Sequence, residues 1–168
     1  MSLREIGIFD EFQATMSAFK GAGAFLVTGS EKPNIMTIGW GTVGIIWGKP
    51  IFTVLVRPSR YTFEILSNLA EFTVCLPLNE HAKMLGFCGS KSGSDFDKFK
   101  ECGFNAEKSL KIDVPHIAEC PVHYECRVIH TNNVMHKQLN DGVISKYYPG
   151  GDFHTIYYGE ILGVFKKE

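Results

Sequence analysis

Residues 33–62 constrain the fold of this chain more than any other stretch. They open with Pro-Asn-Ile-Met-Thr-Ile-Gly-Trp-Gly-Thr and run on as largely apolar sequence to Trp47. After the break at Gly48-Lys49-Pro50, residues 51–56 are almost all β-branched or aromatic, a composition typical of a strand. We therefore expect a long strand that ends at Trp47, a break in the ladder that accommodates Pro50, and a second strand.

A polar, cationic turn follows the second strand. It reads Arg57-Pro-Ser-Arg-Tyr-Thr62, and Thr62 is a good N-cap for a helix over residues 63–69 with Glu64 in its first turn. Unpaired N–H groups at a helix start attract anions, and guanidinium groups add bidentate donors. The turn is a candidate phosphate cradle, although taken alone it fits an ordinary capped helix with solvated arginines slightly better.

The composition is that of a globular protein. The 168 residues are 45% hydrophobic and 21% charged, which predicts one domain over residues 1–168 with a substantial core. The net charge of −1 provides no basic field for nucleic acid, and no apolar run approaches the roughly 20 residues that span a bilayer. The first residues lack the build of a signal peptide, so we expect a cytoplasmic protein without a membrane or nucleic-acid partner.

The cysteine and histidine pattern does not predict a metal site. Five cysteines, an odd number with no CxxC pair, favour reduced thiols in a reducing compartment. Cys120-Pro-Val-His123 has ligand-like spacing, and Cys126 and His130 follow it. However, residues 123–130 alternate as in a strand, which puts His123 and His130 on opposite faces. No second pair completes a tetrahedral shell, so we expect core or surface roles here.

The remaining segments predict a sheet with few helices. An apolar stripe predicts a core-packed helix over residues 9–20, and its members are Phe9, Phe12, Met16 and Phe19. Further strands are expected at residues 24–28, 71–76, 117–131, 134–139 and 154–166. Gly159 and Gly163 inside the last strand indicate bends or a close approach. Six or seven strands in this order fit a closed antiparallel barrel better than a parallel sheet.

A second polar loop lies between two predicted short helices. Asn79 would cap the first helix, at residues 79–87, and Ser94 or Asp95 would start the second, which runs to Glu101. Residues 88–98 between them are rich in glycine, serine and lysine. Such a loop can wrap a polar ligand with backbone N–H groups, although its composition is more typical of a mobile surface loop.

Three separated segments occur in a recognisable order and spacing: Asn34-Ile-Met-Thr-Ile-Gly-Trp40, Arg57-Pro-Ser-Arg-Tyr-Thr62 and Gly89-Ser-Lys-Ser-Gly-Ser-Asp-Phe-Asp-Lys98. Together they resemble the FMN-binding segments of the flavin reductase-like family, which includes flavoredoxins and the reductase components of two-component monooxygenases. The closing His154-Thr-Ile-Tyr-Tyr-Gly-Glu160 is similar to a late strand of that family. The resemblance implies a mainly β, antiparallel split barrel of Greek-key type with a few short flanking helices. It also implies noncovalent FMN at the interface of a homodimer.

The resemblance implies roles for individual residues as well. The isoalloxazine ring would be bordered by Met36, Thr37, Ile38 and Trp40, in the segment that begins at Asn34. The phosphate would be held by Ser59, Arg60 and Thr62, with Arg57 close by. The ribityl chain and phosphate would be covered by Gly89, Ser90, Ser92 and Lys98. His154 would stand near the ring, where a nicotinamide can stack.

The implied activity is oxidoreduction, in which hydride from NAD(P)H passes through FMN to a free flavin or another acceptor. A flavin supplies its own reactive nitrogen, which explains the lack of a nucleophile with a base in the sequence. No GxGxxG motif is present, so a nicotinamide would not bind through a Rossmann unit. Gly39 stands where relatives often carry serine, which enlarges the space beside the ring. Two alternatives stay open: a flavoredoxin-like electron-transfer protein fed by a protein donor with little NAD(P)H turnover, and a ligand-binding barrel that has lost its flavin.

Overall fold

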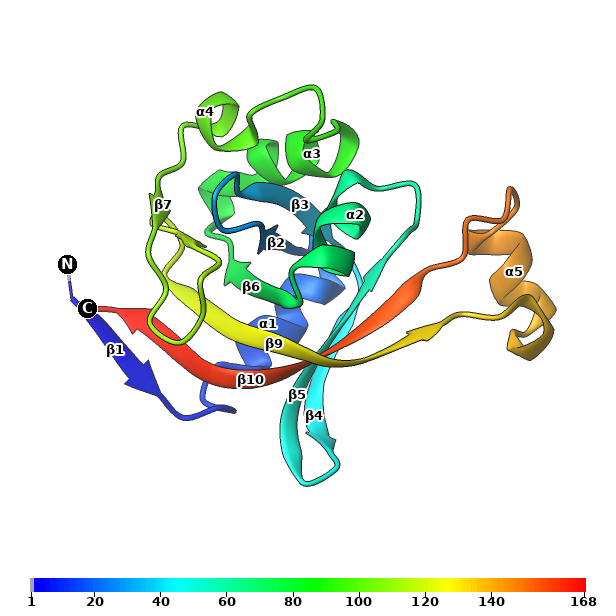
Figure 1. The fold of residues 1–168 in the computed structure, drawn as a ribbon, viewed down its shortest axis with the longest axis horizontal. Helices are drawn as coiled ribbons and strands as arrows, with labels where there is room; N and C mark the ends of the chain where they lie inside the picture. Colours follow the sequence, from blue (N-terminus) through cyan, green and yellow to red (C-terminus); the bar gives the residue numbers. More distant parts are fainter. Residues whose placement is uncertain (1) are drawn as a thin grey trace.

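The computed structural model describes residues 2–168, which form a strongly curved antiparallel sheet with short helices around it (Figure 1). The strands are β1 (Leu3–Ile6), β2 (Ala24–Thr28), β3 (Asn34–Ile38), β4 (Gly41–Ile46), β5 (Lys49–Val56), β6 (Glu71–Leu76), β7 (Ala106–Glu107), β8 (His116–Ile117), β9 (Val122–Asn133) and β10 (Thr155–Lys167). The helices are α1 (Phe12–Lys20), α2 (Tyr61–Asn68), α3 (Ala82–Ser90), α4 (Lys98–Cys102) and α5 (Asp141–Tyr147), with 3₁₀ turns η1 (Asn79–His81) and η2 (His136–Gln138). The predicted mainly β, antiparallel class with short helices is confirmed.

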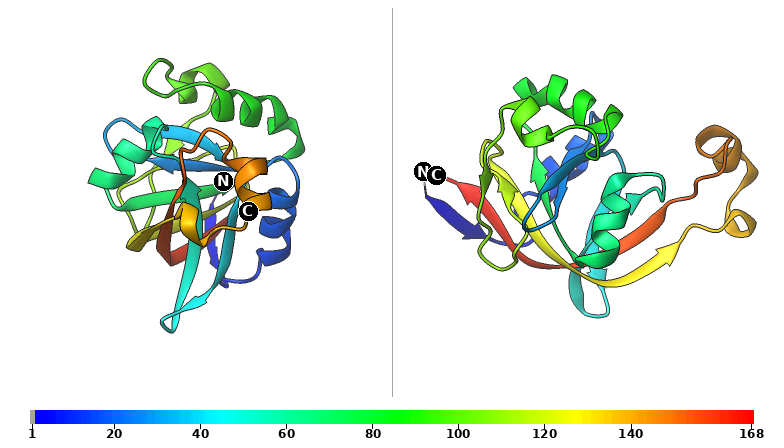
Figure 2. Two further views of the ribbon diagram at one scale, coloured as in Figure 1. Left: turned by 90° about the vertical axis from the view of Figure 1, so that its right-hand side faces the viewer. Right: turned by 45° about the horizontal axis from the view of Figure 1, so that its top comes forward.

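The sheet is wrapped into an incomplete barrel. Its order is β3-β2-β6-β9-β10-β5-β4, with β1 on β10, while β7 and β8 form a separate pair. β3 and β4 follow one another in sequence but lie at opposite ends of this order, so the sheet is split between them. The long strands β9 and β10 bend across the whole molecule, and the pairing of Leu3 with Lys167 brings the two termini together (Figures 1 and 2).

The two glycines inside β10 do mark irregularities, as expected. The register between β9 and β10 shifts at Tyr158/Gly159 and again at Ile161/Gly163. A Cβ on Gly159 would overlap the Phe72 ring, so only glycine allows the strand to approach the core this closely.

The prediction of a single long strand up to Trp47 is wrong. The chain breaks at Gly39 and Trp40, because β3 pairs with β2 whereas β4 pairs with β5. Trp47 and Gly48 alone form the hairpin turn, with φ of 54° and 69°. Pro50 lies inside β5 rather than in the break. Pairing with β10 ends at Ile51, so the missing N–H of Pro50 removes no bond to that neighbour.

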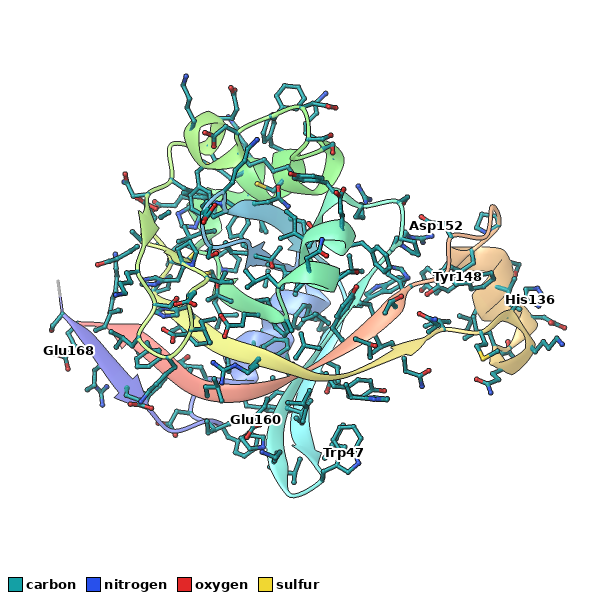
Figure 3. All side chains as sticks on the ribbon, in the orientation of Figure 1. Trp47, His136, Tyr148, Asp152, Glu160 and Glu168 are labelled. Carbon is teal, nitrogen blue, oxygen red and sulfur yellow. The ribbon has the colours of Figure 1, made fainter. Side chains whose placement is uncertain are left out.

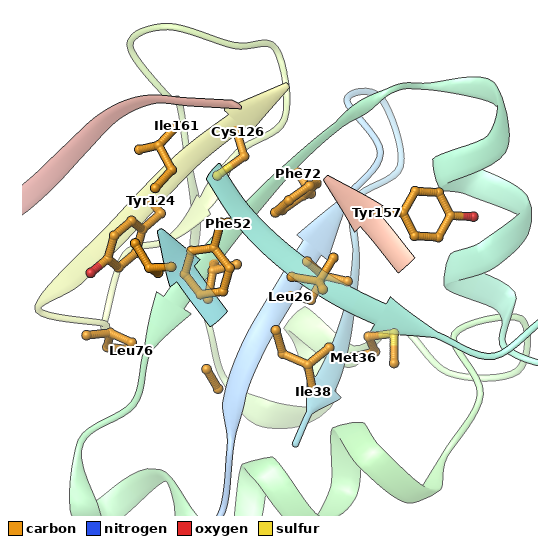
Figure 4. Packing of buried hydrophobic residues seen from close by; sticks show 14 of the residues in the cluster. Leu26, Met36, Ile38, Phe52, Phe72, Leu76, Tyr124, Cys126, Tyr157 and Ile161 are labelled. Atoms are coloured by element: carbon orange, nitrogen blue, oxygen red, sulfur yellow. The ribbon is translucent and has the colours of Figure 1, made fainter. Parts of the chain in front are cut away.

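The barrel interior holds the larger of two hydrophobic clusters (Figure 4). Leu26, Phe52, Phe72 and Tyr124 are fully buried there. The second cluster lies on the other face of β2 and β3, under α3 and α4, and includes Phe25 and Ile35. Because large apolar side chains are packed on both faces of β2 and β3, β3 is held rigidly next to the pockets described below.

The helix predicted over residues 9–20 is shorter in the structure, and its buried apolar face is smaller than predicted. α1 begins at Phe12, and Phe9 and Phe12 are 47% and 42% exposed rather than in the core. Met16 is half-buried against the barrel cluster. The helix instead turns Thr15 inward, where its hydroxyl group lies 2.7 Å from Tyr124 Oη. Of the predicted stripe, Met16 and Phe19 pack on the barrel cluster and Phe9 and Phe12 do not, and the contact between Thr15 and Tyr124 adds a polar anchor.

Two helix starts and one helix end also differ from the sequence predictions. Arg60, not Thr62, occupies the N-cap position of α2, and Thr62 is buried inside the first turn. α4 begins after Asp97, whose carboxylate accepts the Lys100 N–H, rather than at Ser94 or Asp95. α3 continues to Ser90, so the polar loop that was expected from residue 88 begins at residue 91.

Residues 134–154 form an arm that projects from the ends of β9 and β10 (Figures 1 and 2). The strand predicted at residues 134–139 is wrong, because this segment turns through η2 into α5, a helix that was not predicted from the sequence.

The strand predicted at residues 117–131 is two strands, with a turn between Ile117 and Val122. β1 was also missed. Among residues 2–168, no helix is long and apolar enough to cross a membrane.

Candidate functional site

The residues selected from the sequence line two adjoining pockets beside β3. A cationic pocket is lined by Asn34, Met36, Ser59, Arg60, Thr62, Gly89, Ser90, Ser92 and Lys98, among others. An aromatic pocket is lined by Met36, Thr37, Ile38, Gly39, Trp40, Leu55, Arg57, Arg60 and His154. Because Met36 and Arg60 line both, the two pockets form one continuous groove. The structure thus brings together segments that lie more than a hundred residues apart in the sequence.

Three cations line the cationic pocket without a carboxylate partner among the described residues, namely Arg60, Lys91 and Lys98. Lys98 Nζ donates to the carbonyl oxygen of Cys88 at 3.0 Å, and Arg60 Nη1 donates to that of Gly89 at 3.2 Å. Neither forms a salt bridge within the part of the chain that the structure describes. Lys98 is only 5% exposed, and burial, with Arg60 adding to the effect, lowers its pKa. A buried cation without a counter-ion is unfavourable, so this pocket favours an anionic ligand.

The wall of the cationic pocket is held by buried polar contacts. Asn34 Nδ2 donates to Thr62 Oγ1 at 2.9 Å, which leaves the threonine hydroxyl proton available to a ligand. Opposite this pair, a Cβ on Gly93 would overlap the Asn34 amide group, so only glycine lets the loop backbone approach here. The bond from Asn34 to Thr62 therefore joins β3 to α2, and the loop backbone at Gly93 lies against this wall of the pocket.

The aromatic pocket is open to solvent along Trp40. The Trp40 ring is 40% exposed, with its centroid 5.1 Å from that of His154 and 5.0 Å from that of Tyr147. The pocket encloses about 220 Å³, several times the roughly 30 Å³ share of one water molecule. A Cβ on Gly39 would meet no atom within 4 Å, so the space beside this residue is open. The pocket can accept a flat group of substantial size.

His154 is held as a neutral side chain. Its Nδ1 lies 2.8 Å from Tyr148 Oη in a buried contact. Burial, with the positive charge of Arg57 adding to it, lowers the pKa of His154 to about 4. When Nδ1 accepts the hydroxyl proton of Tyr148, Nε2 carries the imidazole hydrogen and is a donor. The sequence did not indicate Tyr148, since nothing in the pattern placed it next to His154.

The structure shows the Arg57 guanidinium group bonded to the arm over residues 134–154, and its expected place close to the phosphate stays a prediction. Its guanidinium group donates to the carbonyl oxygens of Tyr147 at 2.8 Å and Asp152 at 3.0 Å, and it packs over the Tyr148 ring at 5.0 Å. It lines the aromatic pocket and bonds to the arm that carries Tyr148 and Asp152 (Figure 3). These bonds to backbone carbonyl oxygens occupy most of its donors.

Ser59 is already engaged with the arm. Its Oγ donates to Asp152 Oδ2 at 2.5 Å, and its N–H donates to Asp152 Oδ1 at 3.3 Å. Asp152 holds a left-handed backbone conformation, with φ of 54°, after two glycines. The Gly-Gly-Asp turn at 150–152 was the available sequence signal for this contact. A phosphate at Ser59 would have to share that residue with the Asp152 carboxylate.

A third pocket continues beyond the cationic one. It shares Asn34, Tyr61 and Gly93 with it and is otherwise lined mainly by residues 31–33 and 94–99. Three carboxylates line it, those of Glu31, Asp95 and Asp97, against the single cation of Lys32 among its exposed side chains. This acidic groove therefore disfavours a second phosphate next to the first.

The histidines and cysteines outside the groove do not assemble a metal site. No cluster of three or more metal-ligating side chains occurs anywhere in residues 2–168. His123 is buried and lies 3.1 Å from Glu125 Oε1, whereas His130 is exposed. The alternation predicted over residues 123–130 is not kept as far as His130, because the register between β9 and β10 shifts at Tyr158/Gly159. His116 stacks on His123 with ring centroids 3.7 Å apart. This cluster is part of the protein interior.

Comparisons with known proteins agree with the geometry. Residues 16–168 match the model of the flavin reductase like domain. An uncharacterized protein of Archaeoglobus fulgidus is 33% identical over 139 residues, which are 83% of this chain and 68% of that protein. The structure resembles flavoredoxin from Methanosarcina acetivorans, with a TM-score of 0.69, 25% identity, and 86% and 68% of the two chains covered.

A split-barrel protein of the flavin reductase type from Shewanella frigidimarina gives the same TM-score of 0.69 at 14% identity, with 92% and 72% of the chains covered. At that identity the likeness concerns the fold alone. The split-barrel prediction is thereby confirmed.

Proposed function

The chain belongs to the flavin reductase-like family, and from that premise we propose that it is an FMN-binding oxidoreductase that takes hydride from NAD(P)H and delivers electrons to a flavin or another acceptor. The observation that carries the proposal is the buried, unpaired Lys98 beside Arg60, directly adjoining a pocket shaped for a flat aromatic group. A phosphate of charge between about −1.5 and −2 joined to a planar ring system fits both halves at once.

Each part of the groove has a role in this proposal. Lys98, Arg60 and the Thr62 hydroxyl would hold the phosphate, together with N–H groups at the start of α2. The end of α3 and the loop after it would cover the ribityl chain. Backbone groups of β3 and the Gly39-Trp40 linker would border the ring. When bound, the flavin supplies the hydride-accepting chemistry, and the protein positions and shields it.

His154 would contribute as a neutral hydrogen-bond donor. Because its pKa is lowered to about 4, it adds no positive charge to the aromatic pocket at neutral pH. In the tautomer whose Nδ1 accepts the Tyr148 hydroxyl proton, Nε2–H would be available to the ring or to a nicotinamide stacked on it.

The acidic groove supports FMN over FAD as the cofactor. FAD would place a second phosphate and an adenosine beyond the first phosphate, next to Glu31, Asp95 and Asp97. Repulsion between those carboxylates and the added charge lowers the affinity for FAD. FMN has no group beyond its single phosphate, so it would not extend from the cationic pocket into the acidic groove.

A homodimer is the oligomeric state we propose. The β4–β5 hairpin carries the exposed apolar side chains of Ile45, at 60%, and Trp47, at 61% (Figure 3). Ile129 on β9, which β10 separates from the hairpin, is 41% exposed. A second copy of the chain would cover such a patch and would close the open side of the aromatic pocket along Trp40. Sedimentation at micromolar concentration tests the proposal, and a monomer would contradict it.

A flavoredoxin-like electron carrier is the second candidate function. The likeness to a flavoredoxin and the exposed edge at Trp40 favour it, since an open ring edge suits electron transfer from a protein donor. Such a carrier would have the same cofactor groove but little NAD(P)H turnover.

Titration with FMN, followed by flavin fluorescence, tests the groove directly. Arg60→Ala should weaken FMN binding by about 1–3 kcal/mol, because a charged hydrogen bond to the phosphate is lost. Lys83→Met is the matched control for Lys98→Met, since Lys83 is an exposed lysine on α3 outside all of these pockets. Lys98→Met should weaken binding and Lys83→Met should not. Equal FMN affinity in wild type, Arg60→Ala and Lys98→Met would remove the phosphate assignment.

A further inference from the structure

Two cysteines meet directly behind the cationic pocket. Cys88 lies in the last turns of α3, is 1% exposed and lines the pocket. Cys102 is the last residue of α4 and is half-buried. Their Sγ atoms are 3.7 Å apart, and a disulfide requires about 2.05 Å. A small rotation of the two side chains, or a slight approach of the helix ends, would bring the sulfur atoms within bonding distance.

The pair spans the two ends of a loop that shapes the pocket. Residues 91–97 connect α3 to α4, and several of them line the cationic pocket or the acidic groove. A hydrogen bond from Lys98 to the Cys88 carbonyl oxygen already joins the two helices at the neck of this loop. A covalent link between Cys88 and Cys102 would close the same neck permanently.

We propose that Cys88 and Cys102 form a reversible disulfide that clamps the end of α3 to α4 and fixes the loop around the phosphate end of the groove. Fixing the loop lowers the entropy lost when a ligand orders it, so the oxidised protein binds its ligand more tightly. This effect on FMN rests on the proposed function, whereas the disulfide itself does not.

Hydrogen peroxide is the oxidant in this proposal. The Cys102 thiolate attacks one peroxide oxygen, the O–O bond breaks, and the other oxygen leaves as hydroxide and takes a proton to become water. The Cys88 thiolate then attacks Sγ of the Cys102 sulfenic acid, the S–S bond forms, and the displaced hydroxide is protonated to a second water. Two thiols thus lose two electrons and two protons as one peroxide becomes two waters. A dithiol reverses the bond by thiol–disulfide exchange.

The surroundings make this a slow response. Burial raises the pKa of Cys88 to about 12, with Cys102 adding to the effect. Burial also raises the pKa of Cys102, with Glu101 adding to it, while the Cys88 hydrogen bond and Lys98 oppose it. Cys102 is the more exposed thiol and so meets the oxidant first. Because the thiolate is the reactive form, disulfide formation should accelerate as the pH rises from 7 to 9.

Peptide mapping of the full chain under non-reducing conditions, after treatment with hydrogen peroxide, tests the disulfide. The expected product is a peptide pair that joins Cys88 to Cys102, that disappears with dithiothreitol and that is absent from Cys102→Ser. The control variant is Cys120→Ser, which removes the other close cysteine pair, buried Cys75 and Cys120, and should keep the product. Absence of the Cys88–Cys102 product, or a Cys75–Cys120 product alone, would overturn the proposal.

An FMN titration of the oxidised and reduced protein tests the clamp separately. The oxidised wild type should bind FMN about three- to tenfold more tightly than the reduced form, because the loop is preorganised. Cys102→Ser should show no change with oxidation. A quantitative cross-link with unchanged FMN affinity would overturn the clamp. If neither form bound FMN, the proposed function would fail, while the peptide map would still decide whether the disulfide forms.

Discussion

At the scale of single residues, Lys98 determines what the groove can bind. Lys98 is 5% exposed, and its Nζ is bonded to one carbonyl oxygen. Because burial disfavours the charged form of the side chain, its pKa is lowered. A phosphate group offers the missing counter-charge. The sequence predicted Lys98 at the end of a polar loop, whereas in the structure it is the first residue of α4. Burial of its side chain between α3 and α4 is not revealed by any local pattern.

FMN affinity should therefore depend on the protonation of Lys98. Affinity should be full below the pKa of this lysine in the free protein and should fall as the pH rises through it, at a lower pH than the usual value of 10.5. Fluorescence titrations at several alkaline pH values measure the effect. Riboflavin, which lacks the phosphate, is the matched control and should show no such fall. The same pH dependence for both ligands would contradict the assignment.

Gly39 is a second residue with a separable role. A side chain there would point into open space, so Gly39→Ser should change the stability of the fold by no more than about 0.5 kcal/mol. The added hydroxyl narrows the aromatic pocket, and we expect a higher KM for the nicotinamide with FMN affinity retained. Steady-state kinetics beside an FMN titration measures the two effects. A loss of FMN binding equal to that of Arg60→Ala would show that the two pockets are not separable.

At the scale of elements, the arm over residues 134–154 is the part that the sequence did not reveal. β2 and β6 were predicted at their observed bounds, because their β-branched and aromatic runs have clear ends. The break at Gly39-Trp40 and helix α5 escaped prediction for a different reason. Both depend on distant partners: β3 and β4 pair with different strands, and the arm is held by Arg57 and Ser59.

Arg57→Ala should release this arm. The variant loses bonds to the carbonyl oxygens of Tyr147 and Asp152 and the packing over Tyr148. We expect faster proteolytic cleavage within residues 134–154 and a smaller loss of FMN affinity than in Arg60→Ala. Limited proteolysis with mass spectrometry and the FMN titration measure the two effects. If Arg57→Ala lost as much affinity as Arg60→Ala with the arm still protected, Arg57 would have to contact the phosphate after all.

At the scale of the whole molecule, two buried histidines link folding to pH. Burial lowers the pKa of both His116 and His154 to about 4. Within residues 2–168 the imidazole ring of His116 makes no hydrogen bond, and its Nε2 lies 3.5 Å from Glu107 Oε2. Between the unfolded value of about 6.5 and the folded value near 4, the unfolded chain binds more protons than the folded one. Stability should therefore fall as the pH is lowered through this window.

Urea unfolding at pH 7 and pH 4.5 measures this dependence. The expected loss is on the order of 2 kcal/mol for each histidine over that interval. His116→Phe keeps the stack on His123 and removes one titrating group. The fall in its free energy of unfolding between pH 7 and pH 4.5 should therefore be smaller than that of the wild type by the contribution of one histidine. An identical pH dependence in this variant would mean that His116 titrates near its ordinary pKa in the folded protein.

The proposed function of the whole molecule is that one continuous groove binds FMN and receives hydride from NAD(P)H. The most direct measurement is anaerobic: the purified protein is loaded with FMN, NADH or NADPH is added, and the visible flavin absorption is followed. We expect rapid bleaching of the bound flavin, and turnover when free flavin is supplied in excess. If the bound flavin bleached only with dithionite or a protein donor, the NAD(P)H step would be contradicted and the protein would be an electron carrier. If the protein took up no FMN, the proposed FMN-binding function would be contradicted.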